Sequence, residues 1–162
     1  MLLKSLCVAA VVSAIAAGTA FAANITGTDG NDRLVGTPSA DAVQARGGND
    51  QVFGLAGDDH IDGGDGNDVI YGDARCPPGT RDIRYCSTAE SSSDGDDTIT
   101  GGNGNDRIFG QGGKDTITGG DGNDVVFVKD GVKDTVDCGA GSNDVVFADK
   151  VDSLKNCEHV HY

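Results

Sequence analysis

A nine-residue period runs through most of this chain and restricts what it can fold into. Three copies, at residues 63–71, 101–109 and 119–127, each start with two glycines, place aspartate sixth and place an aliphatic residue eighth. Looser copies start at residues 27, 36, 45, 54, 72, 110, 128 and 138. The copy at 72 is interrupted by residues 74–93, and the last two each carry one extra residue. A period this regular predicts a solenoid in which neighbouring repeats stack.

Two positions keep the same residue type through all eleven copies. The sixth-position aspartates are Asp32, Asp41, Asp50, Asp59, Asp68, Asp97, Asp106, Asp115, Asp124, Asp134 and Asp144. The eighth-position residues are Leu34, Val43, Val52, Ile61, Ile70, Ile99, Ile108, Ile117, Val126, Val136 and Val146. The second set predicts that one aliphatic side chain of each repeat points into a thin core.

Each repeat combines a tight turn with a very short strand. Its glycines allow the positive φ angles of a turn, and its last three residues often include β-branched or aromatic side chains that favour a strand. Two repeats complete one coil of about eighteen residues, so every second copy stacks as a parallel strand about 4.8 Å away. We therefore expect an all-β protein, a parallel β-roll (β-helix solenoid) of eleven nonapeptide-like repeats with one inserted loop.

Stacking of this kind concentrates negative charge. The chain has 26 acidic and 12 basic residues and a formal net charge of −14, which argues against nucleic-acid binding and against contact with anionic membranes. Sixth-position carboxylates would form two columns, one from Asp32 to Asp144 and one from Asp41 to Asp134. Neighbours about 5 Å apart would repel by roughly 3 kcal/mol at an effective dielectric constant near 20. Cations between the turns would remove this repulsion.

Calcium suits such columns best among the common metals. It accepts six to eight oxygen ligands in flexible geometry, including the backbone carbonyls that glycine turns expose. Magnesium requires a stricter octahedron and retains its water, and softer metals prefer histidine or cysteine.

The three regular copies resemble the G-G-x-G-x-D-x-U-x nonapeptide of repeats-in-toxin (RTX) proteins, a calcium-binding β-helix repeat. The resemblance extends from Gly27 to Phe147 apart from the insertion. It implies that sixth-position aspartates of stacked turns and loop carbonyls bind calcium, with room for at most about nine ions between turns. The metal ligands that we expect are Asp32, Asp50, Asp59, Asp68, Asp97, Asp106, Asp115, Asp124, Asp134 and Asp144.

The N-terminal residues 1–22 have the pattern of a secretory signal peptide. Lys4 precedes an apolar run that is too short to span a bilayer comfortably, and small residues flank Phe21. We therefore expect a secreted, extracellular protein, with the roll at residues 23–147 and no membrane insertion. Removal of the leader would also remove Cys7.

The four remaining cysteines indicate two disulfides in an exported chain. Three pairings are possible, and we favour the two local ones, Cys76 with Cys86 and Cys138 with Cys157. Residues 74–93 are then a pinned loop, either decorative or a contact surface. Residues 148–162 are expected to lose the repeat and cap the last turn, so that Asp152 should tolerate substitution to asparagine.

The sequence favours a binding protein over an enzyme. His60, His159 and His161 occupy positions typical of solvated surface residues, and residues 91–93 form a serine run without a nearby base. The preferred interpretation is a calcium-binding protein that folds on calcium. Two alternatives remain. One is a calcium-dependent adhesive or carbohydrate-binding surface with a glycan or protein partner, which is favoured by ladders of Thr98, Thr100, Thr116 and Thr118. The other is a disordered acidic polymer.

Overall fold

The structure is a computed structural model that describes residues 22–73 and 94–162. The proposed signal peptide and the insertion, with its expected Cys76–Cys86 disulfide, lie outside the described residues. Within those residues no helix is long and apolar enough to cross a membrane.

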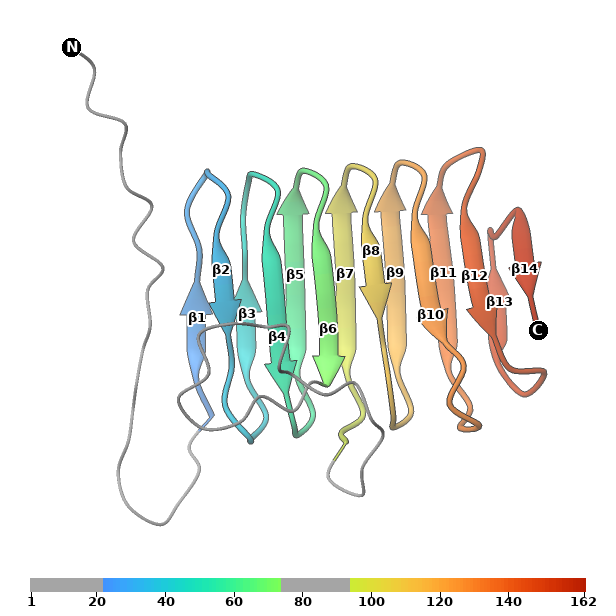
Figure 1. The fold of residues 1–162 in the computed structure, drawn as a ribbon, viewed down its shortest axis with the longest axis horizontal. Helices are drawn as coiled ribbons and strands as arrows, with labels where there is room; N and C mark the ends of the chain where they lie inside the picture. Colours follow the sequence, from blue (N-terminus) through green and yellow to red (C-terminus); the bar gives the residue numbers. More distant parts are fainter. Residues whose placement is uncertain (1–21, 74–93) are drawn as a thin grey trace.

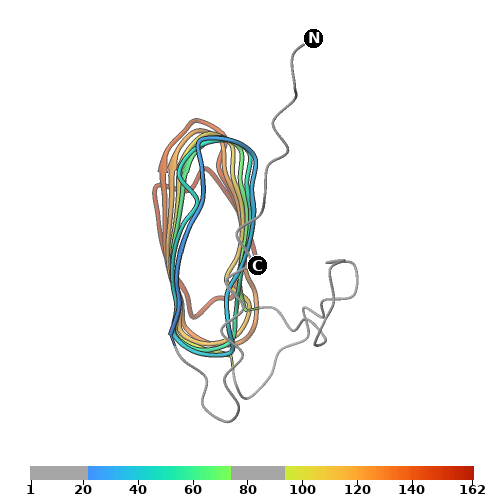
Figure 2. The same ribbon diagram turned by 90° about the vertical axis from the view of Figure 1, so that its left-hand side faces the viewer.

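In the part of the chain that the structure describes, fourteen short strands form two parallel sheets, and successive strands alternate between them (Figure 1). The first sheet contains, in order, β1 (Asn24–Thr26), β3 (Ala42–Gln44), β5 (His60–Asp65), β7 (Thr98–Asn103), β9 (Thr116–Asp121), β11 (Thr135–Ala140) and β13 (Ser153–Lys155). The second contains β2 (Arg33–Val35), β4 (Gln51–Leu55), β6 (Val69–Asp73), β8 (Arg107–Phe109), β10 (Val125–Val128), β12 (Val145–Ala148) and β14 (His159–His161). Seen along the solenoid axis, successive coils superimpose as a flattened tube (Figure 2).

The strand register follows the nine-residue period. Equivalent residues of every second repeat face each other, as in the pairing of Ile61 with Ile99 and of Ile99 with Ile117. The insertion therefore leaves the register intact, because β5 and β7 pair as if it were absent. The prediction of a parallel β-roll is confirmed.

The number of strands exceeds the expectation of eleven. The eleven repeats supply β2 to β12, and β1, β13 and β14 are additional. Residues 148–162 were expected to leave the repeat, yet they add one strand to each sheet. Their glycine pattern is lost, but Leu154 and Val160 still align with Val136 and Val146, so strand pairing continues without it.

The core consists of the expected inward aliphatic side chains, which form one column on each sheet. Every eighth-position side chain, from Leu34 to Val146, is at most 1% exposed. The two sheets thus meet through a single layer of interior side chains, and the roll has little apolar area with which to offset buried charge elsewhere.

The outer faces of the two sheets differ. The second sheet carries a column of six nearly parallel rings, 4.6 to 5.0 Å apart between centroids: Phe53, Tyr71, Phe109, Phe127, Phe147 and His161. The first sheet instead aligns hydroxyl side chains, with Thr98, Thr116 and Thr135 in one row.

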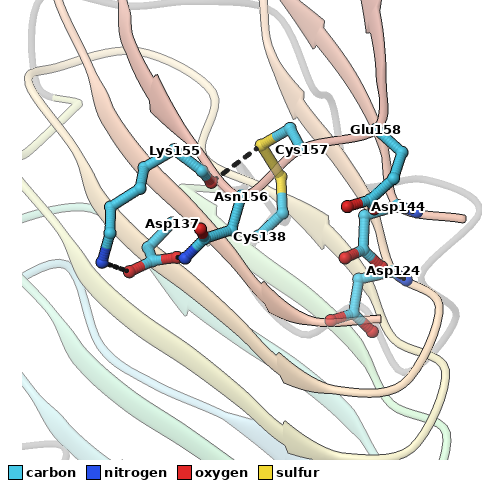
Figure 3. Close-up of a disulfide and its surroundings, with 8 residues drawn as sticks. All are labelled: Asp124, Asp137, Cys138, Asp144, Lys155, Asn156, Cys157 and Glu158. Atoms are coloured by element: carbon cyan, nitrogen blue, oxygen red, sulfur yellow. Dashed lines mark hydrogen bonds and ion pairs between the residues drawn. A yellow bond between two sulfur atoms is a disulfide. The ribbon is translucent and has the colours of Figure 1, made fainter. Parts of the chain in front are cut away.

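A disulfide fastens the last coil to the one before it (Figure 3). Cys138 and Cys157 are bonded, with their Cα atoms 5.2 Å apart, which confirms one of the two predicted pairs. Beside it, Asp137 accepts hydrogen bonds from Lys155 (2.8 Å) and Asn156 (2.7 Å). The bond from Lys155 is the main reason that the pKa of Asp137 lies below its usual value.

Candidate metal centre

Two sets of turns connect the sheets, one at each end of the strands. In the orientation of Figure 1, the upper turns lead from the first sheet to the second, as between β5 and β6, and the lower turns lead back. The upper turns hold Asp32, Asp50, Asp68, Asp106, Asp124 and Asp144. The lower turns hold Asp41, Asp59, Asp97, Asp115 and Asp134. Each set therefore forms a column along one edge of the roll, at one end of the strands, as the sequence predicts.

Backbone hydrogen bonds join the aspartates within each set. The amide of every sixth-position aspartate donates to the Oδ1 atom of its equivalent one coil later, as from Asp106 to Asp124 at 2.9 Å and from Asp97 to Asp115 at 3.0 Å. The two predicted columns are thus present as continuous ladders. All ten predicted ligand residues belong to them, in two groups rather than one.

Both ladders continue beyond the last repeat. The amide of Asp134 donates to Asp152 Oδ1 and that of Asp144 donates to Glu158 Oε2, each at 3.0 Å. Figure 3 shows Asp124, Asp144 and Glu158 in succession along the upper ladder. The expectation that Asp152 lies outside the repeat register is therefore wrong. The signal was present in the sequence, because Asp152 follows Asp134 by the same two-repeat spacing that separates Asp97 from Asp115.

The second oxygen of most of these carboxylates has no hydrogen-bond partner. This holds for the buried Oδ2 atoms of Asp50, Asp59, Asp68, Asp97, Asp106, Asp115, Asp124, Asp134 and Asp144. Asp32 differs, because its Oδ2 accepts from the amide and the hydroxyl of Thr28. Among the predicted ligands, Asp32 is thus the one whose second oxygen is already engaged. A buried carboxylate oxygen without a partner is costly unless a cation or a proton compensates it.

Backbone carbonyls approach the same oxygens. A Cβ atom added to Gly101, the first residue of its repeat, would lie 2.5 Å from Asp106 Oδ2 and 2.4 Å from the carbonyl oxygen of Gly119. Glycine is required there because any side chain would collide with both oxygens. Carboxylate and carbonyl oxygens together form the ligand type that calcium prefers. No group of three or more metal-binding side chains occurs in the described ranges, so a cation here would complete its shell with carbonyls and water.

The electrostatic environment opposes ionised aspartates when no cation is bound. Burial raises the pKa of Asp106 to about 7, with a further contribution from the charges of Asp124 and Asp68. Burial also raises the pKa of Asp97, to about 9, and repulsion from Asp73, Asp115 and Asp59 adds to it. The predicted repulsion along the columns is therefore present in the folded chain.

A second ladder runs beside the upper column and was not foreseen. The amides of four fifth-position asparagines, Asn49, Asn67, Asn105 and Asn123, each donate to the side-chain oxygen of the asparagine one coil earlier, at 2.6 to 2.9 Å. The sequence could have predicted this ladder, because asparagine recurs directly before the upper aspartates. This ladder ties neighbouring upper turns together independently of the carboxylates.

Comparison with known proteins points to the same repeat. A family model described as the RTX calcium-binding nonapeptide repeat matches four segments, at residues 18–52, 26–60, 45–74 and 91–126. Together these segments cover more than half of the chain. Neither the curated proteins nor the solved structures gave a match.

Proposed function

Because the chain belongs to the RTX calcium-binding repeat family, we propose that it is a secreted protein whose β-roll folds when calcium enters its turns. The observation that carries the proposal is the pair of columns of buried carboxylate oxygens without hydrogen-bond partners. A cation that binds only the folded chain adds its binding free energy to the stability of the fold.

The proposed ligands are the sixth-position aspartates together with carbonyls of the glycine turns. Asp50, Asp59, Asp68, Asp97, Asp106, Asp115, Asp124, Asp134 and Asp144 each offer a buried Oδ2 atom. Asp32 would first have to release its bonds to Thr28. We propose several calcium ions, at most about nine, shared between neighbouring turns. Bound calcium would neutralise the columns and thereby permit the deprotonated form of each carboxylate.

Two features support secretion. Residues 1–22 have the order of a signal peptide, and a disulfide joins Cys138 to Cys157. Disulfides persist mainly in oxidising compartments. Extracellular fluids also contain calcium at concentrations that suit sites of modest affinity.

Calcium titration of the secreted chain tests the proposal directly. With EDTA at neutral pH, the far-ultraviolet circular dichroism spectrum should be that of an unfolded chain, and millimolar calcium should convert it to a β spectrum. Native mass spectrometry should count several bound ions. A spectrum that stays the same throughout the titration would refute calcium-coupled folding.

A matched pair of variants tests the assignment of the ligands. Asp106→Asn keeps the size of the side chain but removes its charge at two neighbouring interturn sites, so we expect a higher calcium midpoint and lower cooperativity. Asp121→Asn removes the same charge from an exposed position in the following regular copy and should leave both unchanged. Equal midpoints for the two variants would show that the roll acts only as a general polyanion.

A calcium-dependent adhesive surface is the second candidate. Paired threonines of β7 and β9, Thr98 with Thr116 and Thr100 with Thr118, form two rows on the first sheet. The rings of the second sheet are less suited to sugars, because each inner ring has both faces against its neighbours. A glycan array probed with calcium and with EDTA tests this candidate, and Thr98→Val with Thr116→Val should abolish any genuine signal.

A further inference from the structure

Asp73 is a buried carboxylate outside the two aspartate columns. It occupies the second position of its repeat, where the three regular copies have glycine, and no other repeat has a carboxylate there. Asp73 is 2% exposed and ends β6, directly before residues 74–93. A buried charge in a place where the repeat does not require one suggests a separate role.

Hydrogen bonding and packing bring Asp73 close to the Asp97 carboxylate. Asp73 Oδ2 accepts a hydrogen bond of 3.1 Å from the amide of Gly95, two residues before Asp97. A Cβ atom on Gly72, the neighbour of Asp73, would lie 2.2 Å from Asp97 Oδ2 and 2.8 Å from the carbonyl oxygen of Gly110. The Asp97 carboxylate and the Gly110 carbonyl thus lie beside Gly72, and the neighbouring charge of Asp73 acts on Asp97 at this lower turn.

Each of the two carboxylates has one oxygen without a partner. Asp73 Oδ1 and Asp97 Oδ2 are both buried and accept no hydrogen bond, and neither residue pairs with a lysine or arginine within the described residues. Burial and then the charge of Asp94 raise the pKa of Asp73 to about 8. Counting only residues 22–73 and 94–162, the site therefore has two carboxylate oxygens and no ion pair with a basic side chain.

We propose that Asp73 Oδ1 and Asp97 Oδ2 bind one calcium ion together, and that this ion is the most tightly held in the roll. The inference rests on the proposed function and adds a ranking of the sites. Calcium affinity rises with the number of charged ligands, and the second position supplies an extra carboxylate at this turn alone.

Chelator competition followed by native mass spectrometry tests the ranking on the full secreted chain. Calcium is withdrawn in steps by buffers of decreasing free calcium, and the ions that remain are counted. Asp73→Asn should release the last ion at a free calcium concentration at least about tenfold higher than the unchanged chain does. Asp73→Gly, which restores the residue of the regular copies, should behave in the same way and guards against misfolding of the first variant.

The controls separate this inference from the proposed function. Asp121→Asn, at an exposed position, should release its last ion at the same concentration as the unchanged chain, and a β spectrum at saturating calcium should show that each variant folds. If both Asp73 variants fold and keep the last ion as tightly as Asp121→Asn does, Asp73 shares a proton with Asp97 and the inference is overturned. If the unchanged chain binds no calcium, the proposed function itself fails.

Discussion

The upper and lower turns of the roll share one backbone path but differ in sequence. The three regular upper turns place glycine at the second position, where Gly64, Gly102 and Gly120 have φ angles of +97°, +116° and +122°. The lower turns place Leu55 and Gln111 there, with φ angles of +97° and +73°. The glycines of the repeat therefore lower the energy of this turn, but the turn also forms without them.

The two ends also differ in the environment of their aspartates. Burial raises the pKa of Asp68 and Asp124 in upper turns to about 6 and that of Asp106 to about 7. In lower turns it raises the pKa of Asp115 to about 7 and that of Asp97 to about 9, and neighbouring acidic residues add to the shift. Both columns thus oppose ionised carboxylates, and the turn of Asp97 has the greatest need for a cation or a proton.

The largest effect that we predict is a reversal of pH dependence by calcium. Unfolded aspartates have pKa values near 3.9, so between about pH 4 and 8 the calcium-free roll holds more protons than the unfolded chain. Its free energy of unfolding should rise as the pH falls from 8 to 5. With calcium present the same acidification should destabilise the roll, because protons compete with the metal.

Circular dichroism at one temperature between pH 5 and 8, with calcium or EDTA, measures this reversal. In EDTA the β spectrum should grow as the pH falls from 8, where the chain is unfolded, and in calcium it should weaken. In EDTA, Asp97→Asn should flatten the pH dependence more than Asp68→Asn does, because the pKa shift of Asp97 is larger. An equal reduction of the pH dependence in the two variants would contradict the difference between the upper and lower turns.

A smaller effect is expected when a regular turn loses its glycine. In Gly102→Ala the new Cβ atom would lie 2.0 Å from the carbonyl oxygen of Gly64, at a φ of +116°. Backbone must move to relieve this contact, so we expect a loss of at least about 2 kcal/mol of stability in saturating calcium. Urea unfolding measures the loss, and a change below experimental error would show that the regular turns tolerate side chains as those of Arg46, Leu55 and Gln111 do.

The smallest effect is a gain of stability at a lower turn. Gln111 has a positive φ, and its buried Nε2 atom has no hydrogen-bond partner. Gln111→Gly should remove both costs and raise the free energy of unfolding by about 1 kcal/mol. The same urea measurement checks this prediction. A loss of stability would mean that the glutamine side chain contributes packing that outweighs the strain.

The period of the sequence was sufficient to predict the sheets, the parallel register and the two aspartate columns. It was sufficient because eighth-position residues such as Ile61 and Ile99 must share one interior face. It failed for Asp152 and Glu158, since the tail keeps the spacing or chemistry of the ladder without the glycines that made the repeat visible. The period also did not predict that Asp32 Oδ2 accepts hydrogen bonds from Thr28, because these bonds depend on the local turn geometry.

The aspartate ladders have a direction, and this bears on how the roll can be assembled. Each aspartate amide donates forward along the chain, to a carboxylate that appears one coil later, as from Asp106 to Asp124. When the chain is made from its N-terminus, the aspartate amides of the newest coil therefore have no carboxylate acceptor until the next coil forms. Only when Asp152, Glu158 and the cysteine bridge arrive are the last donors matched. Each new coil thus completes the ladders of the coil before it, and the tail completes the last two donors.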